Sequence, residues 1–541
     1  MSASQDTDIA RGARELLGFK HLRPGQEEAV RAVLAGRDTL AVLPTGSGKS
    51  AIYELATALG GGPTVVVSPL LALQRDQIEK IEDEHIGSAA ALNSTLSGTK
   101  REELLEELDE HELEYLFLAP EQFASVETLD KLQEAKPRLL VVDEAHSISE
   151  WGHDFRPEYL RLGSVAETIG RPTTLALTAT AAPPVRAEIV ERLALRDPVE
   201  VVRGFDRPNI HLAVEEHHDQ RHKLRALVEN IVNGERPAIV YTATRRHSEE
   251  LAGQLRAAGV SGLPYHAGLH RHEREDAQTA FMEDEIEVVV ATIAFGMGVD
   301  KPNVRAVIHA EISDSVDAYY QEIGRAGRDG EPARAVLFYR SEDVGLRRFF
   351  AGAGQLAVDE ALAIAETVEA AGGPLDVHTL HEATGLSETK IVAALGRLED
   401  VGFVELLPDG EVTKADGAVA VDDAAEAAAA AQHSRKEYER TRVEMVRRYA
   451  EASGCRREYI LSYFGEAFEP PCGNCDNCDA GLTHVEMGKH PFEIGSSVRH
   501  PELGVGTVQR YDNDTILVLF DEHGYRTLAL ELVLERGLLS S

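Results

Sequence analysis

Two acidic residues near position 140 are placed to bind a metal ion and a phosphate. Leu139 to Val142 form an apolar run, and Asp143 and Glu144 follow it directly. A buried parallel strand that ends in carboxylates delivers them to the edge of the sheet where phosphates bind. We expect Asp143 to bind Mg²⁺ through water and Glu144 to orient or deprotonate an attacking water molecule.

A loop with stacking side chains comes soon after these acids. It contains Trp151, which is the chain's only Trp, followed by His153, Phe155 and Arg156. Aromatic rings and guanidinium planes stack on nucleic-acid bases. The segment 141–157 therefore predicts nucleotide hydrolysis and nucleic-acid contact in adjoining positions, as a motor would need.

Residues 43–50, Leu-Pro-Thr-Gly-Ser-Gly-Lys-Ser, predict a phosphate-binding loop. Backbone N–H groups of such a loop bind phosphate oxygens, Lys49 reaches the β- and γ-phosphates, and the Ser50 hydroxyl binds Mg²⁺. Leu43 replaces the first Gly of the strict pattern, so a Gly-rich turn that happens to contain Lys is the alternative. The acids at 143 and 144 favour ATP, and we expect it to contact Thr45, Gly46, Ser47, Gly48, Lys49 and Ser50.

Three residues upstream of this loop are candidates for reading the base of ATP. The Gln26 amide can pair with an adenine edge, Phe19 can stack on the ring, and Arg23 lies between them in sequence. The alternative for Phe19 is a hydrophobic staple, since a Phe just before a helix often packs in this way.

A second group of candidates lies between residues 296 and 330. Arg325 and Arg328 are three positions apart, which predicts one face at a helix start. Arginines that reach a γ-phosphate from a second domain make hydrolysis depend on domain closure. The alternative is a solvated basic face, which the Gly-flanked spacing disfavours. We assign Gln321 to catalysis with them and Asp300 to nucleotide binding.

All four cysteines lie close together near the C-terminal end of the sequence, at Cys455, Cys472, Cys475 and Cys478. This clustering argues against a scattered disulfide framework. Four thiolates, three of them at C-x-x-C spacing, suit tetrahedral Zn²⁺. Redox-active thiols are the alternative. We expect a closed structural zinc site that braces the neighbouring helices.

The hydrophobic pattern places these residues on an α/β framework. Residues 1–204 and 205–350 each alternate apolar strands with amphipathic helices, which predicts two consecutive parallel-sheet domains. The predicted strands are 39–43, 64–68, 115–119, 139–142 and 174–178 in the first domain, and 238–241, 262–265, 287–292, 305–309 and 335–339 in the second.

The remaining sequence predicts three smaller domains. Three helices and a hairpin at Asp409-Gly410 predict a winged-helix-like domain at 355–420, which either engages duplex DNA or serves as a packing module. A long Ala-rich helix leads into a zinc-binding module at 430–482. Short strands at 506–511, 515–520 and 525–528 predict a small β-barrel at 490–541.

The net charge of −37 is unusual for a nucleic-acid binder. It fits either a salt-rich cytoplasm or acidity spread outside a locally positive cleft. In both cases we expect nucleic acid to bind within a groove. Because neither an apolar run of 18 residues nor a leader pattern is found, we expect a cytoplasmic protein.

Ten motifs occur in the order in which superfamily 2 DNA helicases of the RecQ family carry them, and the chain resembles that family. The motifs are FKHLRPGQ (19–26), LPTGSGKS (43–50), VVSPLLALQRDQ (66–77), LNSTLSG (92–98), DEAHSISEWGHDFRPEY (143–159), LTATA (177–181), FDRPNI (205–210), YHAGL (265–269), ATIAFGMGVDKPNV (291–304) and QEIGRAGRDG (321–330).

This resemblance implies two RecA-like domains and ATP-driven 3′–5′ unwinding of DNA in repair or recombination. It implies adenine reading by Phe19, Arg23 and Gln26, and domain coupling by Thr178 and Thr180. The pattern CRR…YFGE…CGNC resembles the family's zinc module. The winged-helix-like domain departs from the family because it precedes that module.

The last fifty residues resemble the Tudor-like tail of UvrD-type repair helicases, which implies a protein partner. Two rival functions remain at this point. One is an RNA helicase, because the sequence Asp-Glu-Ala-His also occurs in RNA motors. The other is a DNA-binding scaffold that uses ATP as a switch and does not unwind.

Overall fold

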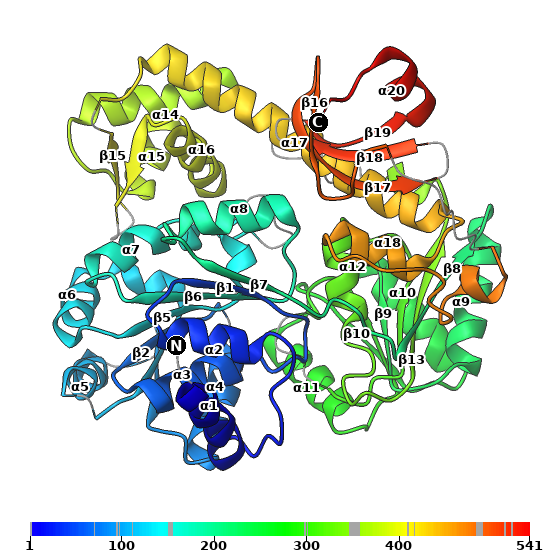
Figure 1. Ribbon diagram of the computed structural model, residues 1–541, viewed down its shortest axis with the longest axis horizontal. Coiled ribbons are helices and arrows are strands. Elements are labelled where there is room, and N and C mark those ends of the chain that lie inside the picture. Colours follow the sequence, from blue (N-terminus) through cyan, green and yellow to red (C-terminus); the bar gives the residue numbers. More distant parts are fainter. Residues whose placement is uncertain are drawn as a thin grey trace. The chain divides into compact units, whose positions relative to one another are not determined.

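The computed structural model describes residues 3–69, 71–93, 96, 98–110, 112–149, 155–296, 299, 301–345, 357–407, 411–415, 417–482, 491–512, 515–520 and 523–540. It divides into two compact units (Figure 1). The first comprises residues 1–204 and 354–435, and the second comprises 205–353 and 436–541. Among the described helices, none is both long and apolar enough to cross a membrane.

The first unit contains a seven-stranded parallel sheet in the order β3-β4-β2-β5-β6-β1-β7. The five predicted strands all form. The structure adds two edge strands, β3, which is built mostly of alanine, and β7, whose apolar run is interrupted by Glu200. The strands are β1 (Thr39–Val42), β2 (Thr64–Val67), β3 (Ala89–Leu92), β4 (Tyr115–Leu118), β5 (Leu139–Val142), β6 (Thr173–Thr178) and β7 (Val199–Val202).

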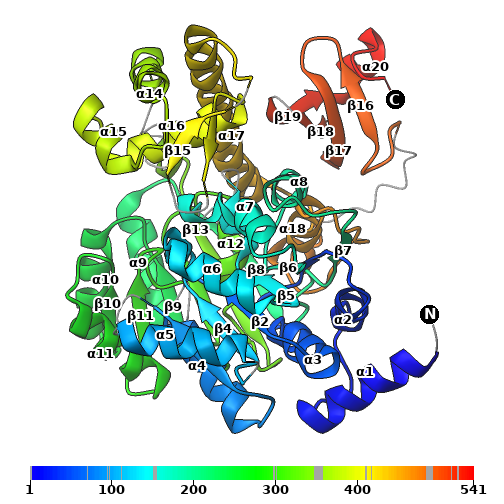
Figure 2. The same ribbon diagram turned by 90° about the vertical axis from the view of Figure 1, so that its left-hand side faces the viewer.

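Helices cover both faces of this sheet, as expected for strands buried on both sides (Figures 1 and 2). The helices are α1 (Ala3–Leu16), α2 (Gln26–Leu34), α3 (Ser50–Gly60), α4 (Leu71–Asp83), α5 (Gly98–Asp109), α6 (Val126–Ala135), α7 (Leu162–Thr168) and α8 (Pro183–Arg192), with short 3₁₀ turns η1 (Pro120–Ala124), η2 (Ala145–Ile148) and η3 (Pro157–Tyr159). Apolar residues of α1 to α4 and of the central strands share one core.

The helical region after residue 356 belongs to the first unit. It contains α14 (Val358–Ala371), α15 (Val377–Thr384), α16 (Glu388–Asp400) and an antiparallel pair, β14 (Val404–Leu406) with β15 (Val412–Lys414). Three helices and a hairpin were predicted here, although the turn at Asp409-Gly410 lies outside the described residues. The long helix α17 (Val421–Glu451) begins inside this core with Ala424, Ala425 and Ala428.

The second unit contains a six-stranded parallel sheet in the order β10-β11-β9-β12-β13-β8. The predicted strands form, and β8 is added at the edge, where it is less buried than the central strands. The elements are β8 (Ile210–Glu216), β9 (Ala238–Tyr241), β10 (Gly262–Tyr265), β11 (Val288–Ala291), β12 (Ala306–His309) and β13 (Ala333–Tyr339), with α9 (Gln220–Asn233), α10 (Arg245–Ala257), α11 (Arg271–Met282) and α12 (Val316–Ile323).

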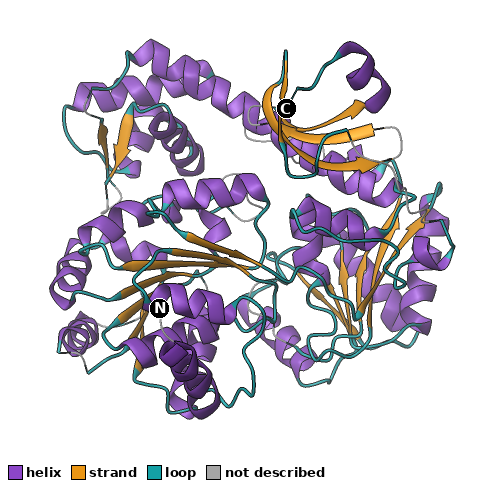
Figure 3. Ribbon diagram, in the orientation of Figure 1, coloured by secondary structure: helices purple, strands orange, loops and turns teal. Residues whose placement is uncertain are grey.

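The same unit carries the cysteine-rich segment and a small antiparallel sheet, whose strands Figure 3 draws in orange. The cysteine-rich segment forms α18 (Arg456–Tyr463) and α19 (Asp476–Asp479). The sheet has the order β16-β17-β18-β19. Its elements are β16 (Ser497–His500), β17 (Gly504–Asp512), β18 (Thr515–Phe520) and β19 (Gly524–Ala529), followed by α20 (Leu530–Arg536).

Candidate nucleotide and zinc sites

The predicted phosphate loop connects β1 to α3, with Lys49 as the N-cap and Ser50 as the first helical residue. Gly46 and Gly48 have φ values of 75° and 73°, a left-handed conformation that glycine adopts without a steric cost. The loop leads directly into the N-terminal end of α3, where the helix dipole favours an anion. Lys49 Nζ lies 3.4 Å from the carbonyl oxygen of Leu43.

The three residues predicted to read adenine lie next to this loop. Gln26 Nε2 donates to the carbonyl oxygens of Ser47 at 2.9 Å and Gly48 at 2.8 Å, and its Oε1 accepts from the backbone of Arg23 at 2.7 Å. The Arg23 guanidinium also donates to the Gly46 carbonyl. Phe19 is half-buried against the apolar core, as the staple alternative requires, so part of its ring remains exposed.

The two acids follow β5 at the carboxyl edge of the sheet. The phosphate loop follows β1 at the same edge. Burial and the neighbouring Glu144 raise the pKa of Asp143 to about 7, while Lys49 opposes this rise. Glu144 has a φ of 48°, which is rare outside glycine, and its N–H donates to Asp143 Oδ1 at 2.9 Å. A buried carboxylate whose pKa is raised by burial and by a second carboxylate beside it is a favourable place for a divalent cation.

His146 extends this acid pair toward β6, a connection that the sequence reasoning did not assign. Its Nδ1 lies 2.9 Å from the hydroxyl of Thr178 and 3.3 Å from Glu144 Oε2. The Thr178 hydroxyl in turn donates to the carbonyl of Thr180 at 3.1 Å. Both residues lie in the motifs quoted above, so their importance was visible in the sequence. Their contact was not, because it joins residues 32 positions apart.

The predicted DNA-sensing loop is only partly described, because Trp151 and His153 lie outside the described residues. Phe155 and Arg156 are half-buried, and the Arg156 N–H donates to the Ser147 carbonyl at 2.8 Å. Tyr159, just beyond them, donates its hydroxyl to the carbonyl of Asp143 at 3.1 Å. One of these hydrogen bonds joins the loop to η2, and the other joins η3 to the backbone of Asp143.

The arginine motif differs from the prediction in one respect. Arg325 and Arg328 do not begin a helix; they follow α12, which ends at Ile323 because Gly324 caps it and a series of turns comes next. Gln321 lies in the last turn of that helix. Arg325 is 6% exposed and lies close to Tyr241. Burial raises the pKa of Tyr241 to about 12, and the positive charge of Arg325 limits that rise. Arg328 donates to the carbonyl of Val299 at 2.9 Å. Asp300 lies outside the described residues.

The first unit fits a magnesium-bound nucleoside triphosphate. The Ser47 hydroxyl is buried and has no hydrogen-bond partner within the described part of the chain, so it is available to a phosphate oxygen. A side chain at Gly48 would place its Cβ 3.1 Å from the Gln26 amide, which explains why the loop needs glycine there. The loop amides and Lys49 would hold the phosphates, and Ser50 and Asp143 would hold Mg²⁺.

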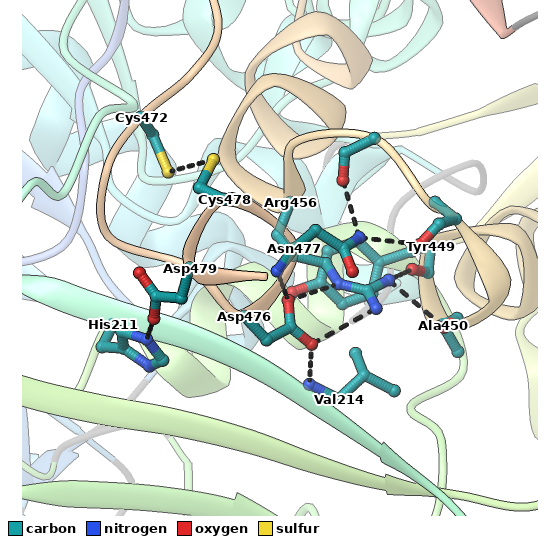
Figure 4. Close-up of polar contacts among 12 residues, drawn as sticks. His211, Val214, Tyr449, Ala450, Arg456, Cys472, Asp476, Asn477, Cys478 and Asp479 are labelled. Atoms are coloured by element: carbon teal, nitrogen blue, oxygen red, sulfur yellow. Dashed lines mark hydrogen bonds and ion pairs between the residues drawn. The ribbon is translucent and has the colours of Figure 1, made fainter. Parts of the chain in front are cut away.

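The four cysteines meet in the second unit, where their Sγ atoms all lie within 4.8 Å of one another. The Sγ atoms of Cys472 and Cys478 are 3.7 Å apart (Figure 4). Cys455 and Cys475 are buried. Hydrogen bonds among the thiols lower the pKa of Cys472 and raise that of Cys455. Four soft ligands at this spacing fit a closed tetrahedral Zn²⁺ site.

The zinc-binding segment is joined to the edge of the parallel sheet. Arg456 Nε donates to Asp476 Oδ1 at 3.0 Å, and the other carboxylate oxygen accepts from the N–H of Val214 on β8 at 2.8 Å (Figure 4). Arg457 donates to Asp206 at 2.6 Å and to the Ile210 carbonyl at 2.8 Å. Zinc would therefore hold α18 and α19 in place against β8.

Three family models match the chain, one over each of the two parallel-sheet domains and one over the cysteine-rich segment. They are the DEAD/DEAH box helicase model over residues 23–188, the helicase conserved C-terminal domain over 222–330 and the RecQ zinc-binding model over 417–479. The probable ATP-dependent DNA helicase RecS of Bacillus subtilis is 34% identical over 93% of this chain and 99% of that protein. The chain belongs to the RecQ family of ATP-dependent DNA helicases.

Other RecQ relatives are longer than this chain. The RecQ helicase of Pasteurella multocida is 34% identical over 86% of this chain, which spans only 61% of that protein. Among solved structures, the DUF1998 helicase MrfA bound to DNA and AMPPNP has a TM-score of 0.53 at 18% identity, covering 78% of this chain and 64% of that one. This likeness shows the helicase fold alone.

Membership of the RecQ family confirms several of the predictions. ATP and Zn²⁺ are the expected cofactors, two RecA-like domains carry the motor, and the cysteine cluster is the family's zinc site. The small antiparallel sheet at the C-terminal end is present as well.

Proposed function

We propose that this RecQ-family protein translocates 3′ to 5′ on single-stranded DNA and unwinds duplex DNA in repair or recombination. The observation that carries the proposal is the hydrogen-bonded segment that joins the acid pair to the loop after it. Tyr159 binds the Asp143 carbonyl at 3.1 Å, so a change at the loop reaches the hydrolytic acids through the backbone.

In this proposal the residues of the first unit bind and hydrolyse ATP. Lys49 neutralises phosphate charge, Ser50 and Asp143 hold Mg²⁺, and Glu144 positions water and accepts its proton. Phe19, Arg23 and Gln26 surround adenine. From the second domain, Gln321, Arg325 and Arg328 complete the site, together with Asp300. Trp151, His153, Phe155 and Arg156 contact DNA and gate hydrolysis.

We further propose a role for each of the domains expected from the sequence. Residues 1–204 and 205–350 form the motor, 430–482 brace it through zinc, and 355–420 and 490–541 are accessory domains.

A strand-displacement assay tests this function. Duplexes with a 3′ tail, a 5′ tail or an RNA loading strand are incubated with the protein, ATP and Mg²⁺. We expect displacement of the 3′-tailed DNA duplex only. Displacement of the 5′-tailed duplex would show that the protein moves with the opposite polarity, and displacement of the RNA duplex would favour an RNA helicase. ATP hydrolysis without any displacement would favour the ATP-switched scaffold.

A further inference from the structure

The second unit contains a groove that the motor does not use. It has a volume of about 510 Å³ and lies between the C-terminal half of α17 and the strands β18 and β19. Its lining is unusual for so acidic a chain, because three arginines face one carboxylate. The lining residues are Arg440, Thr441, Glu444, Met445, Arg448, Leu517, Tyr525, Arg526 and Thr527.

The wall formed by the small sheet is attached to the zinc module. Tyr525 stacks on Tyr463 of α18 with ring centroids 5.4 Å apart, and the Arg510 guanidinium lies 4.0 Å from the ring centroid of Tyr459. A guanidinium over an aromatic face is a favourable contact. These two contacts hold β17 and β19 against α18, and the Tyr459 hydroxyl of α18 donates to the Met445 carbonyl of α17 at 2.8 Å. Both walls of the groove are therefore attached to the same helix.

The arginines of α17 are arranged along a line. Arg440, Glu444 and Arg448 occupy every fourth position and so share one face of the helix. The two arginines are separated by roughly 12 Å along the helix axis, at 1.5 Å per residue. Arg526 stands on the opposite wall. Cations spaced along both walls suit an extended polyanion better than a single small anion.

The other side chains of the groove can contact a sugar-phosphate backbone. The hydroxyl groups of Thr441 and Thr527 can bind phosphate oxygens, as threonine does in protein–DNA interfaces. Tyr525 is 4% exposed and already stacked on Tyr463, so its ring is not available to stack on a base. The groove would thus bind the backbone without reading sequence.

The charge of the whole chain strengthens this argument. A net charge of −37 repels nucleic acid over most of the surface, and a cleft lined by the opposite charge concentrates the field. With three arginines and one glutamate, the lining carries two net positive charges.

We propose that this groove, defined by Arg440, Arg448 and Arg526, is a second DNA-binding site that holds the phosphodiester backbone of a strand outside the motor. The inference rests on the proposed function in that it takes DNA as the polyanion. It assigns to the C-terminal sheet a role in nucleic-acid binding.

The test is the equilibrium binding of a fluorescein-labelled single-stranded oligonucleotide, followed by anisotropy at several salt concentrations. The double variant Arg440→Ala/Arg526→Ala should bind roughly tenfold more weakly at low salt, and the slope of log K against log salt should become shallower by about 1.4, since each phosphate contact contributes about 0.7. Arg440→Lys/Arg526→Lys should keep most of the affinity, and Glu444→Gln should bind more tightly than the parent.

The matched control is Arg11→Ala/Arg196→Ala, which removes the same charge from side chains that are 57% and 66% exposed elsewhere. Its slope should equal that of the parent. DNA-independent ATP hydrolysis should be unchanged in the groove variant, which also shows that the variant has folded.

The outcomes separate this inference from the proposed function. If the parent binds and unwinds DNA and the groove variant has the same affinity and salt slope, the groove does not bind DNA; an acidic protein segment then becomes its partner. If the parent neither binds nor unwinds DNA while it hydrolyses ATP, the proposed function fails first.

Discussion

Gln26 is hydrogen bonded to Gly48 of the phosphate loop, with 2.8 Å between the side-chain Nε2 and the backbone carbonyl oxygen. The same amide nitrogen lies 3.1 Å from the position that a Cβ would take at Gly48. The residue predicted to read adenine therefore also supports the loop that binds the phosphates. The predicted recognition of adenine and the phosphate loop would therefore be linked through one side chain.

Replacing Gln26 by alanine should weaken ATP binding. The variant loses the hydrogen bonds to the loop and to adenine, and the cost of about 1 to 2 kcal/mol corresponds to roughly a tenfold higher Kd. Titration with a fluorescent ATP analogue measures it. Gln254→Ala on the exposed side of α10 is the control, and an unchanged Kd for Gln26→Ala would exclude the assigned role.

Glu144→Gln should leave ATP binding intact and reduce turnover by about 10² to 10⁴-fold, because an amide cannot accept the proton of the attacking water. ATP binding and steady-state hydrolysis are measured on the same preparation. Glu158→Gln changes an exposed glutamate nearby and should hydrolyse ATP like the parent. Normal turnover in Glu144→Gln would remove this residue from the chemical step.

The zinc site predicts one Zn²⁺ per chain. Cys475→Ser should release the metal and lower the melting temperature, since α18 and α19 then lose their common attachment to β8. Metal content is read by atomic emission and stability by thermal melting. Ser462→Ala alters α18 without removing a ligand and should keep the zinc. Full zinc occupancy in Cys475→Ser would contradict the four-cysteine site.

The contact between α16 and α8 should make stability depend on pH. Burial raises the pKa of Glu399 to about 7 from an ordinary 4.5, and Arg192, 3.2 Å away, only partly opposes it. Between these values the folded chain binds more protons than the unfolded chain, so the free energy of unfolding falls as the pH rises.

Glu399→Gln should remove this fall in the free energy of unfolding at higher pH. The variant should match the parent below about pH 4.5 and exceed it by about 2 kcal/mol above pH 7, a value that allows for partial exposure of the carboxylate. Melting temperatures at the two pH values measure the difference, with Glu388→Gln, an exposed glutamate of the same helix, as the control. Equal differences at both pH values would show that Glu399 does not titrate in this window.

The single Trp151 gives an optical test of the DNA-sensing loop. Its fluorescence should change when single-stranded DNA is added, because stacking on a base alters the indole environment. Trp151→Phe should abolish the signal and keep DNA binding. Constant Trp fluorescence during DNA-stimulated ATP hydrolysis would place the loop away from the nucleic acid.

Most central elements of the fold were predictable from sequence, whereas edge strands and one helix end were not. Strands such as β5 are buried on both faces and therefore have continuous apolar sequences. Edge strands such as β7 and β8 need no such run, and they were missed. Arg325 and Arg328 were expected at a helix start, but Gly324 ends α12 before them, and the pattern of charges alone does not distinguish the two ends of a helix.

The sequence by itself determined which chemical groups the protein carries and at what local spacing. The phosphate loop, Asp143-Glu144 and the C-x-x-C pairs are recognisable because a loop, a strand end or a metal site is built from residues a few positions apart. Only the tertiary structure decided the contacts of His146 with Thr178 and of Arg192 with Glu399. It also placed the arginines of α17 and Arg526 around one groove. Such contacts depend on how helices and sheets pack, and no local pattern encodes that packing.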